Sequence, residues 1–292
     1  MTSISATATV APARRGSRLR RRFARRPTAV IGLFGVCVVV VVALLAPWLA
    51  PYAPDASDYN AILQPPGSPG HLLGTDDIGR DLLSRLVVGT RASLTAGVLA
   101  TMLAVVVAVP LGMIAGYYRG WIDPIVSRVT DVVLSFPFLI LAVGLAAILG
   151  PSLINAAIAL AVSQVPMFVR IARGEVLSLR ETEYVQAAVV NGAPTRVILF
   201  RHMLPNILNP LIVQATVAIP AAIIGAAVLS FLGLGVQPPT PAWGTMLSDA
   251  QQYVSQAPWF ATFPGLAIAL TTLSFNLFGD GLRDVLDVRM RS

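Results

Sequence analysis

The dominant pattern along this chain is a series of apolar stretches of about 20 residues, separated by shorter polar segments. A helix of that length crosses the roughly 30 Å hydrocarbon layer of a membrane. The pattern predicts six spans, at Ala29–Leu49, Ala92–Tyr117, Val129–Leu149, Ser152–Val169, Ile207–Leu234 and Phe260–Phe278. We therefore expect an all-α integral membrane protein with six transmembrane helices and with both termini on one side.

The composition favours the same class. Of the 292 residues, 55% are hydrophobic and 12% are charged, and the mean hydropathy is +0.74. Soluble domains carry about 25% charged residues, which is roughly twice as many.

Residues 1–27 hold eight arginines and no periodic apolar face, which predicts a disordered cytoplasmic tail. The tail could also be the start of a signal peptide. The apolar run that follows is longer than the 7 to 15 residues or so of a signal sequence, so we favour a retained first helix. Residues 28–91 then comprise this helix and an external, Pro-rich and amphipathic segment, and residues 92–292 form the main transmembrane domain.

The arginines predict the orientation, because short cytoplasmic segments carry most basic residues. If the amino end is inside, 18 of the 21 arginines lie inside, and Arg80, Arg85 and Arg91 lie outside. The loop at residues 170–205 is then cytoplasmic.

The segment Arg180–Arg201 within this loop is too polar for the membrane. It holds five charged side chains, and burying all of them near the bilayer centre would cost on the order of 10 kcal/mol or more. Its residues favour two short helices, the first capped by Thr182 and followed by Gly192 in a left-handed position. Pro194 suits the first turn of the second helix, and Pro205 is expected to end it.

The same segment offers contacts for another protein. Ala187 and Ala188 are small enough for a groove wall to come close. Apolar anchors for such a helix-in-groove contact are Val197, Ile198, Phe200 and Leu204.

Several kinds of chemistry are excluded by missing residues. All 21 basic residues are arginine, so the chain has no lysine for a nucleotide-binding P-loop or for a Schiff base. Cys37 is the single cysteine, and His71 and His202 have no cysteine cluster near them, which argues against a zinc site. If transport uses nucleotide, another chain must bind it.

Four separated motifs carry a family resemblance. The cytoplasmic segment contains AAVVNG followed by HMLP, and Ala187, Ala188, Gly192, Leu204 and Pro205 keep the register of the EAA loop of ABC importer permeases. The other three motifs are GHLLGTDDIGRDLLSRLVVGTRASL from Gly70, SFLGLGVQPPTPAWGTML from Ser230 and GDGLRDVLD from Gly279. Together they resemble the C-type permease subunit of the branch that imports dipeptides, oligopeptides and nickel, over nearly the whole chain after the tail.

The resemblance implies a type I ABC importer permease fold in a bacterial inner or plasma membrane, with a cytoplasmic coupling helix that docks on an ATPase. It implies as partners a second, B-type permease, two ATPase subunits or domains, an extracytoplasmic binding protein and membrane lipid, but no nucleic acid. ATP and Mg²⁺ would bind to the ATPases, and this chain would hold no cofactor and no catalytic residue. The expected coupling residues are Glu183, Tyr184, Ala187, Ala188, Gly192, Arg196, Arg201, His202, Leu204 and Pro205.

The chain departs from the family pattern at a few positions. Gln186 stands where the general motif has Glu, and His202 where it often has Ile, and both fit the peptide branch better. Pro194, Val165 and Val288 replace a common Ser, Trp and Pro. His202 could act as a proton switch, but a docking or hydrogen-bonding role is the expectation.

The external segment could be mistaken for a metal site, because Asp76, Asp77 and Asp81 lie close together. We expect instead the start of an amphipathic helix, capped by Thr75 or Asp77. Its apolar stripe would comprise Ile78, Leu82, Leu86 and Val87. A structural or subunit-interface role is expected for Gly74, Thr75, Asp76, Gly79, Arg80 and Asp81.

Polar residues and prolines inside the predicted spans are candidates for functional or structural roles. Gln164, Gln214 and Asn276 could line a pathway, or could form interhelical hydrogen bonds. Asp131 is expected to pair with Arg128, three residues before it. The prolines that could kink helices are Pro110, Pro137 and Pro220.

The function that the resemblance implies is one half of a translocation pathway for di- or oligopeptides, powered by partner ATPases. The same machinery could import nickel or another small solute. A stand-alone secondary transporter would need an inverted repeat and an acidic residue at mid-span, and a membrane enzyme would need a catalytic constellation. We find no clear sign of either in the sequence.

Overall fold

The computed structural model describes residues 26–287, and within this range the chain is helical without any β-strand. Most of the predicted tail at 1–27 and Val288 lie outside the described residues. The helices are α2 (Pro27–Leu49), α3 (Leu82–Tyr118), α4 (Ile122–Leu134), α5 (Phe138–Leu149), α6 (Leu153–Arg180), α7 (Glu183–Val190), α8 (Thr195–Val197), α9 (Leu204–Phe231), α10 (Trp243–Ala250) and α11 (Pro258–Asp287). A π-helical turn, Ile198–Met203, joins α8 to α9, and a 3₁₀ turn, Gln251–Tyr253, follows α10.

The all-helical membrane class is confirmed. Five helical segments in the described range are long and apolar enough to cross a membrane, and α4 with α5 makes a sixth if this bent pair is one span. The two helices meet at 91°. Pro137 precedes α5 with an extended ψ and has no backbone N–H to continue the ladder of α4, so the predicted third span is broken there. α3 and α9, by contrast, run on through Pro110 and Pro220.

The second span begins earlier than predicted. α3 has 37 residues and starts at Leu82, where the pattern predicted a start at Ala92. Its cap is Asp81, whose carboxylate accepts hydrogen bonds from the Ser84 N–H at 2.8 Å and the Ser84 hydroxyl at 2.7 Å. Caps at Thr75 or Asp77 were therefore wrong, and Ile78 lies before the helix.

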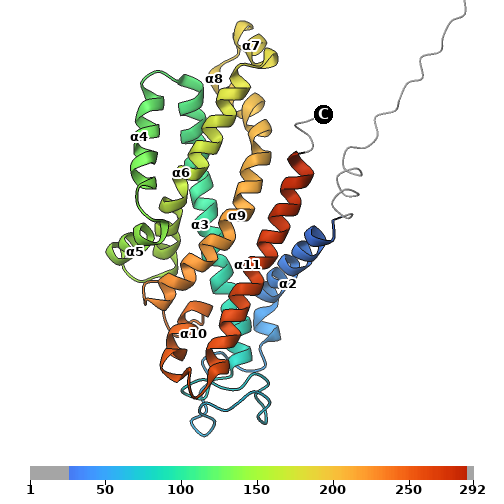
Figure 1. Cartoon of the computed structure of the whole chain (residues 1–292), viewed down its shortest axis with the longest axis vertical. Coiled ribbons are helices and arrows are strands. Elements are labelled where there is room, and N and C mark those ends of the chain that lie inside the picture. Colours follow the sequence, from blue (N-terminus) through green and yellow to red (C-terminus); the bar gives the residue numbers. More distant parts are fainter. Residues whose placement is uncertain (1–25, 288–292) are drawn as a thin grey trace, which may run out of the picture.

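The bundle is centred on α3, α6 and α9, which lie side by side (Figure 1). Glycines permit the close approach of α3 to α6. A Cβ on Gly112 would lie 2.7 Å from the carbonyl oxygen of Val169, and one on Gly116 would lie 2.8 Å from that of Arg173. No larger residue fits without moving the two backbones apart.

Ion pairs attach α4 to α6. Arg170 donates to Asp131 over 2.7 Å, and Arg173 holds Asp123 with two hydrogen bonds, one of them 2.7 Å long. The expected pair between Asp131 and Arg128 was wrong, because Arg170, which is 39 residues away in sequence, lies opposite Asp131.

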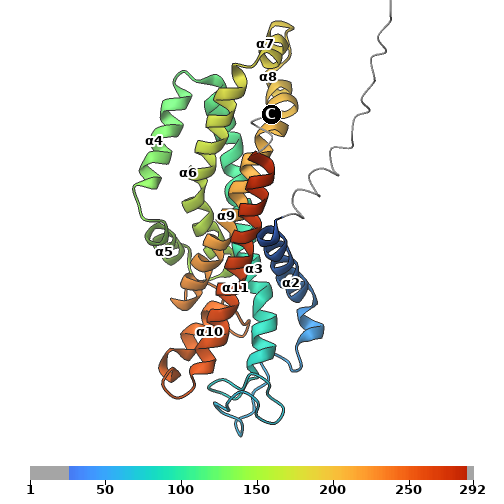
Figure 2. The same cartoon turned by 45° about the vertical axis from the view of Figure 1, so that its right-hand side comes forward.

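The molecule has two distinct ends. The hairpin of α7 and α8 forms one end, and α10 with the loop between α2 and α3 forms the other (Figures 1 and 2). Arg26, just before α2, is paired with Asp284 near the end of α11. The start of α2 therefore lies beside the end of α11.

Candidate functional site

The predicted coupling segment is a helical hairpin that projects beyond the bundle, and we call Glu181–Asn206 the hairpin. Its base is fixed to the end of α3. Arg180 donates to the carbonyl of Tyr117 at 2.7 Å and stacks over the Tyr117 ring, and Arg119 pairs with Glu181 at 2.6 Å. These contacts couple the position of the hairpin to α3 as well as to α6.

The turn at the tip of the hairpin is built around glycine. Gly192 has φ +73°, which confirms the predicted left-handed position. Its N–H bonds to the carbonyl of Val189, and the next N–H, of Ala193, bonds to that of Ala188, both at 3.0 Å. These two bonds form a Schellman motif, which ends α7 and reverses the chain.

The second arm differs from the prediction. Pro205 does not end a helix, because α8, the π-helical turn and α9 follow one another, and Pro205 lies in the first turn of α9. Pro205 follows directly after the π-helical turn, in which the N–H of Leu204 bonds to the carbonyl of Leu199, and such a π adjustment accommodates a proline that lacks the N–H of a regular helix. Thr182 occupies the cap position of α7, but its hydroxyl donates to the carbonyl of Leu179 and does not cap the helix.

One face of the hairpin is buried in this chain's own core. Val185, Ile198, Leu199 and Met203 pack with residues of α3 and α6 in one cluster, and Ile198 is only 1% exposed. Ile198 was therefore wrong as an anchor for a partner. Ala188 and Leu204 are partly buried against the same cluster.

The remaining surface of the hairpin is exposed and carries several large apolar side chains. Val190 is 86% exposed and Phe200 is 62% exposed, and about half of the surface of Tyr184 and Val189 is also free. Glu183, Ala187, Gly192, Arg196, Arg201 and Pro205 are also exposed. Val189 and Val190 were not predicted as exposed anchors, although two adjacent valines at the end of a helix, close to the turn glycine Gly192, are a readable signal of an apolar tip.

The polar side chains of the hairpin hold its two arms together. The amide of Asn206 donates to the Tyr184 hydroxyl at 3.1 Å and to the His202 carbonyl at 2.6 Å. The half-buried ring of His202 makes no hydrogen bond or ion pair with the described part of the chain. Its role in docking stays a prediction.

At the other end, the loop between α2 and α3 is ordered by a buried polar network. Asp76 is fully buried and accepts hydrogen bonds from the N–H groups of Ile78 at 3.1 Å and Arg80 at 2.8 Å, and from the Arg80 side chain at 2.5 Å. Thr75 is also fully buried, and its hydroxyl joins Ala61 to Gln64. The turns require Gly74 and Gly79, with φ +81° and +79°.

The network extends from the loop to α10. Arg80 and Arg85 lie 3.8 and 3.6 Å from Asp249, and Asp81 bonds to His71 at 3.0 Å. Burial is the largest effect on both Asp77 and Asp249, and it raises the pKa of each carboxyl above its ordinary value.

A metal at this position is not supported. No group of three or more potential ligands with metal-binding geometry occurs among residues 26–287. Asp76 and Asp77 face arginines and Asp81 bonds to His71, and the side chains of Thr75, Asp76 and Asp81 are buried in this chain. The geometry thus gives them a structural role, and a contact with a second subunit stays a prediction.

The three candidate pathway residues lie in different environments. Gln164 is buried, accepts a hydrogen bond from Thr101 of α3 at 3.3 Å and reaches the Ala218 carbonyl of α9 at 3.5 Å. This geometry favours the interhelical role for Gln164. Gln214 is half-buried and Asn276 is exposed.

Comparison with known protein families accounts for this arrangement. Residues 108–292 match the family described as "Binding-protein-dependent transport system inner membrane component". The chain belongs to this family. Residues 15–66 also match the N-terminal transmembrane domain of oligopeptide transport permease C.

Relatives from several bacteria are similar over about nine-tenths of their length. The chain is 46% identical to a dipeptide transport system permease protein of Alkalihalophilus pseudofirmus, over 93% of this chain and 89% of the relative. It is 50% identical to the dipeptide transport permease of Escherichia coli K12, over 92% and 91%. A glutathione transport system permease protein of Pectobacterium atrosepticum is 44% identical, over 93% and 90%.

A solved structure has the same fold. An inward-facing structure of the MetNI methionine ABC transporter aligns with a TM-score of 0.56 and 22% identity, over 69% of this chain and 96% of that one. The predicted type I ABC importer permease fold is therefore confirmed, and the chain is a multi-pass membrane protein of a transport system.

Proposed function

We propose that this chain forms half of a transmembrane pathway for di- or oligopeptides, driven by ATPase subunits that dock on the hairpin. One observation carries the proposal: the hairpin is fastened to the bundle through a buried apolar face and presents Val190 and Phe200 on the other. A membrane transport subunit with a rigid, apolar projection has the shape needed to receive movement from a partner.

The partners are those implied by membership of a family of binding-protein-dependent transport components. Two cytoplasmic ATPase subunits or domains bind ATP and Mg²⁺, because this lysine-free chain lacks the P-loop lysine. A B-type permease completes the pathway, and an extracytoplasmic binding protein delivers the solute. The present chain contributes no catalytic group.

The substrate class is supported by the relatives reported above. Their names specify dipeptides and glutathione, and both contain peptide bonds and free carboxylates. Nickel or another small solute is the alternative, since the candidate pathway residues Gln164, Gln214 and Asn276 carry no charge that selects a peptide.

Orientation is part of the proposal. The excess of arginines on the hairpin side favours a cytoplasmic hairpin, cytoplasmic termini and an external loop at residues 50–81. A Cys37→Ser background permits single cysteines at Asn191 and Tyr59, both of which are exposed. In intact cells, an impermeant maleimide should label the cysteine at 59 but not the one at 191.

Transport itself is tested by reconstitution. The test uses vesicles that contain this chain, its partner permease, the ATPases and the binding protein. They should take up a labelled dipeptide only when ATP is present on the side of the membrane that carries the ATPases. Uptake by this chain alone, without an ATPase, would refute the mechanism. ATP-dependent uptake of Ni²⁺ with no response to peptides would leave the mechanism intact and replace the substrate.

A further inference from the structure

Arg91 is an arginine on a membrane-spanning helix that has no acidic partner in the described part of the chain. Of the three arginines on the side opposite the hairpin, Arg80 and Arg85 belong to the ionic network of the outer loop. Arg91 is exposed and forms neither an ion pair nor a hydrogen bond with residues 26–287. A cation on a spanning helix is costly unless it meets a counter-charge or reaches the interface.

A groove between α2 and α3 surrounds this arginine. Its cavity volume is about 370 Å³, and its walls include Leu44, Pro47 and Trp48 from α2 and Arg91, Leu94 and Thr95 from α3. Arg91 and Thr95 are one helical turn apart on the same face of α3. The Thr95 hydroxyl also has no partner among the described side chains, so two donors face an otherwise apolar groove.

The groove lies at the level of the lipid headgroups. α2 has 23 residues and is therefore about 34 Å long, which slightly exceeds the hydrocarbon thickness of about 30 Å. Its last turn, with Pro47 and Trp48, must reach the interface. Trp48 is 79% exposed, and tryptophan is the residue typical of that level.

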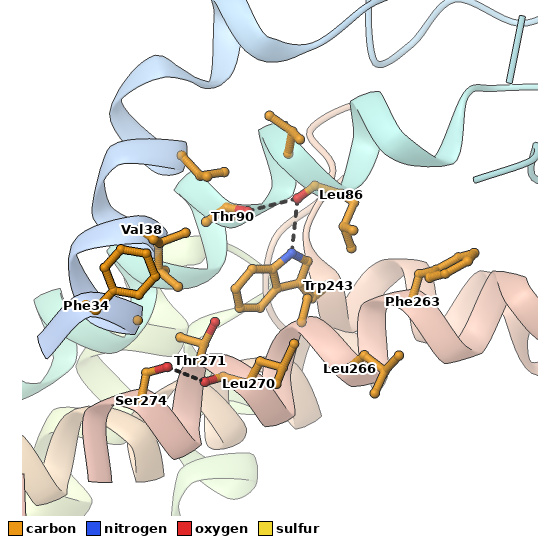
Figure 3. A pocket seen from close by; sticks show the side chains of 15 residues that line it. Phe34, Val38, Leu86, Thr90, Trp243, Phe263, Leu266, Leu270, Thr271 and Ser274 are labelled. Carbon is orange, nitrogen blue, oxygen red and sulfur yellow. Dashed lines mark hydrogen bonds between the residues drawn. The ribbon is translucent and has the colours of Figure 1, made fainter. Parts of the chain in front are cut away.

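A second cavity shows what a purely hydrocarbon site looks like in the same protein. It has a volume of about 520 Å³ and lies between α2, α3 and α11 under Trp243 (Figure 3). Thr90 and Trp243 both donate to the carbonyl of Leu86, and Ser274 donates to that of Leu270. No charged side chain of the described residues lines it, so of these two cavities the groove at Arg91 is the one that offers a positive charge to an anionic ligand.

We infer that the groove between α2 and α3 binds one phospholipid, whose phosphate accepts hydrogen bonds from Arg91 and Thr95 and whose acyl chain lies along Leu44 and Leu94. A guanidinium can donate two parallel hydrogen bonds to two oxygens of a phosphate. A bound water could accept one of these hydrogen bonds, but it could not neutralise the positive charge of Arg91. An anionic lipid such as phosphatidylglycerol is preferred over a zwitterionic one, because no acidic side chain offsets Arg91.

The experiment uses the assembled complex in nanodiscs that contain a trace of phosphatidylglycerol with a photoreactive diazirine in its acyl chain. After illumination, adducts on the peptides that contain Leu44 and Leu94 are quantified by mass spectrometry. Arg91→Gln should lower this yield about fivefold, the effect of one cation at the lipid surface. Arg91→Lys should retain part of it.

Arg128→Gln is the matched control, since Arg128 lies on α4, away from the groove, and forms no ion pair with the described residues. It should leave the adducts unchanged. A diazirine-labelled diacylglycerol, which lacks the phosphate, should label the groove weakly in every variant.

Two results would overturn the inference. Equal labelling by diacylglycerol and phosphatidylglycerol, unaffected by Arg91→Gln, would mean that the groove takes hydrocarbon alone. Absent labelling in the parent complex, together with loss of the partner permease in Arg91→Gln, would assign Arg91 to a subunit contact. The leaflet, but not the site, rests on the proposed orientation, and the cysteine labelling described above tests that orientation separately.

Discussion

The amide of Asn206 donates to the hydroxyl of Tyr184 across 3.1 Å and thereby joins the start of α9 to α7. The two residues lie on the two arms of the hairpin, 22 positions apart in the chain. A partner that moves α7 must therefore also move α9, which is one of the three central helices. The hairpin should therefore move as one rigid unit, because one face is packed against the core and its two arms are joined by a hydrogen bond.

This tie makes a prediction about local stability. Asn206→Ala should lower the local free energy of unfolding of the hairpin by about 1 kcal/mol, which is the usual net contribution of a hydrogen bond. The amides of α7 should then exchange roughly fivefold faster. Hydrogen exchange followed by mass spectrometry measures this. Asn191→Ala, at the exposed turn, is the control and should leave exchange in α7 unchanged, and equal effects of both variants would argue against the tie.

Ile198 and Phe200 are two residues apart in the π-helical turn and should have opposite phenotypes. Ile198→Ala removes a buried side chain and should lower the free energy of unfolding by about 2–5 kcal/mol. Phe200→Ala should change it by less than about 0.5 kcal/mol but reduce co-purification of the ATPases. Thermal unfolding and pull-down of the complex separate the two effects. If Phe200→Ala retains the ATPases and full uptake, the exposed face is not the docking surface.

Two glycines of the outer loop give a matched pair. Gly67 and Gly79 have φ +84° and +79°, but a Cβ at Gly67 meets nothing within 4 Å, whereas one at Gly79 would overlap the carbonyl oxygen of Asp58. Gly67→Ala should cost only the left-handed penalty of about 1–2 kcal/mol. Gly79→Ala should disrupt the loop.

Limited proteolysis of the complex measures this difference. The loop of the Gly79→Ala variant should be cleaved far faster than that of Gly67→Ala. Similar cleavage of both would show that the network around Asp76 tolerates a displaced turn.

The network between the outer loop and α10 predicts a pH dependence. Burial raises the pKa of Asp77 and Asp249 above the ordinary value of 3.8, so the folded state holds these protons more tightly than the unfolded state. Their contribution to stability is fully present below pH 3.8 and is lost as the pH rises through the raised pKa values. Asp249→Asn should flatten this part of the pH profile.

Thermal unfolding of the complex between about pH 4 and 7 tests the sign. Asp249→Asn should be at least as stable as the parent at neutral pH. A clear loss of stability at neutral pH would mean that the attraction of Arg80 and Arg85 to Asp249 exceeds the cost of its burial.

Gln164 and Gln214 should also behave differently. Gln164→Leu removes a contact between α3, α6 and α9 and should cost about 0.6 kcal/mol, and at most about 1.7 kcal/mol. Gln214 has no hydrogen bond to the described residues, so Gln214→Leu should leave stability unchanged. If Gln214 lines the pathway, the same substitution should alter the rate of peptide uptake. Unaltered uptake in Gln214→Leu would remove it from the pathway.

The sequence by itself determined the class of protein, the positions of the long apolar helices and the presence of the hairpin. Runs of apolar residues have to lie in lipid, charged segments have to leave it, and glycine at residue 192 has to occupy a left-handed turn, so these features depend on local chemistry alone. The broken third span was readable in part, since Pro137 marks its position but not its 91° angle.

The tertiary structure decided which way side chains face and which charges meet. Ile198 points into the core and Val190 points out, because the faces of helices of three to eight residues are set by what they pack against. Asp131 pairs with Arg170 and not with its sequence neighbour Arg128, and Arg91 has no partner among residues 26–287. An ion pair depends on distance in space and not on distance along the chain.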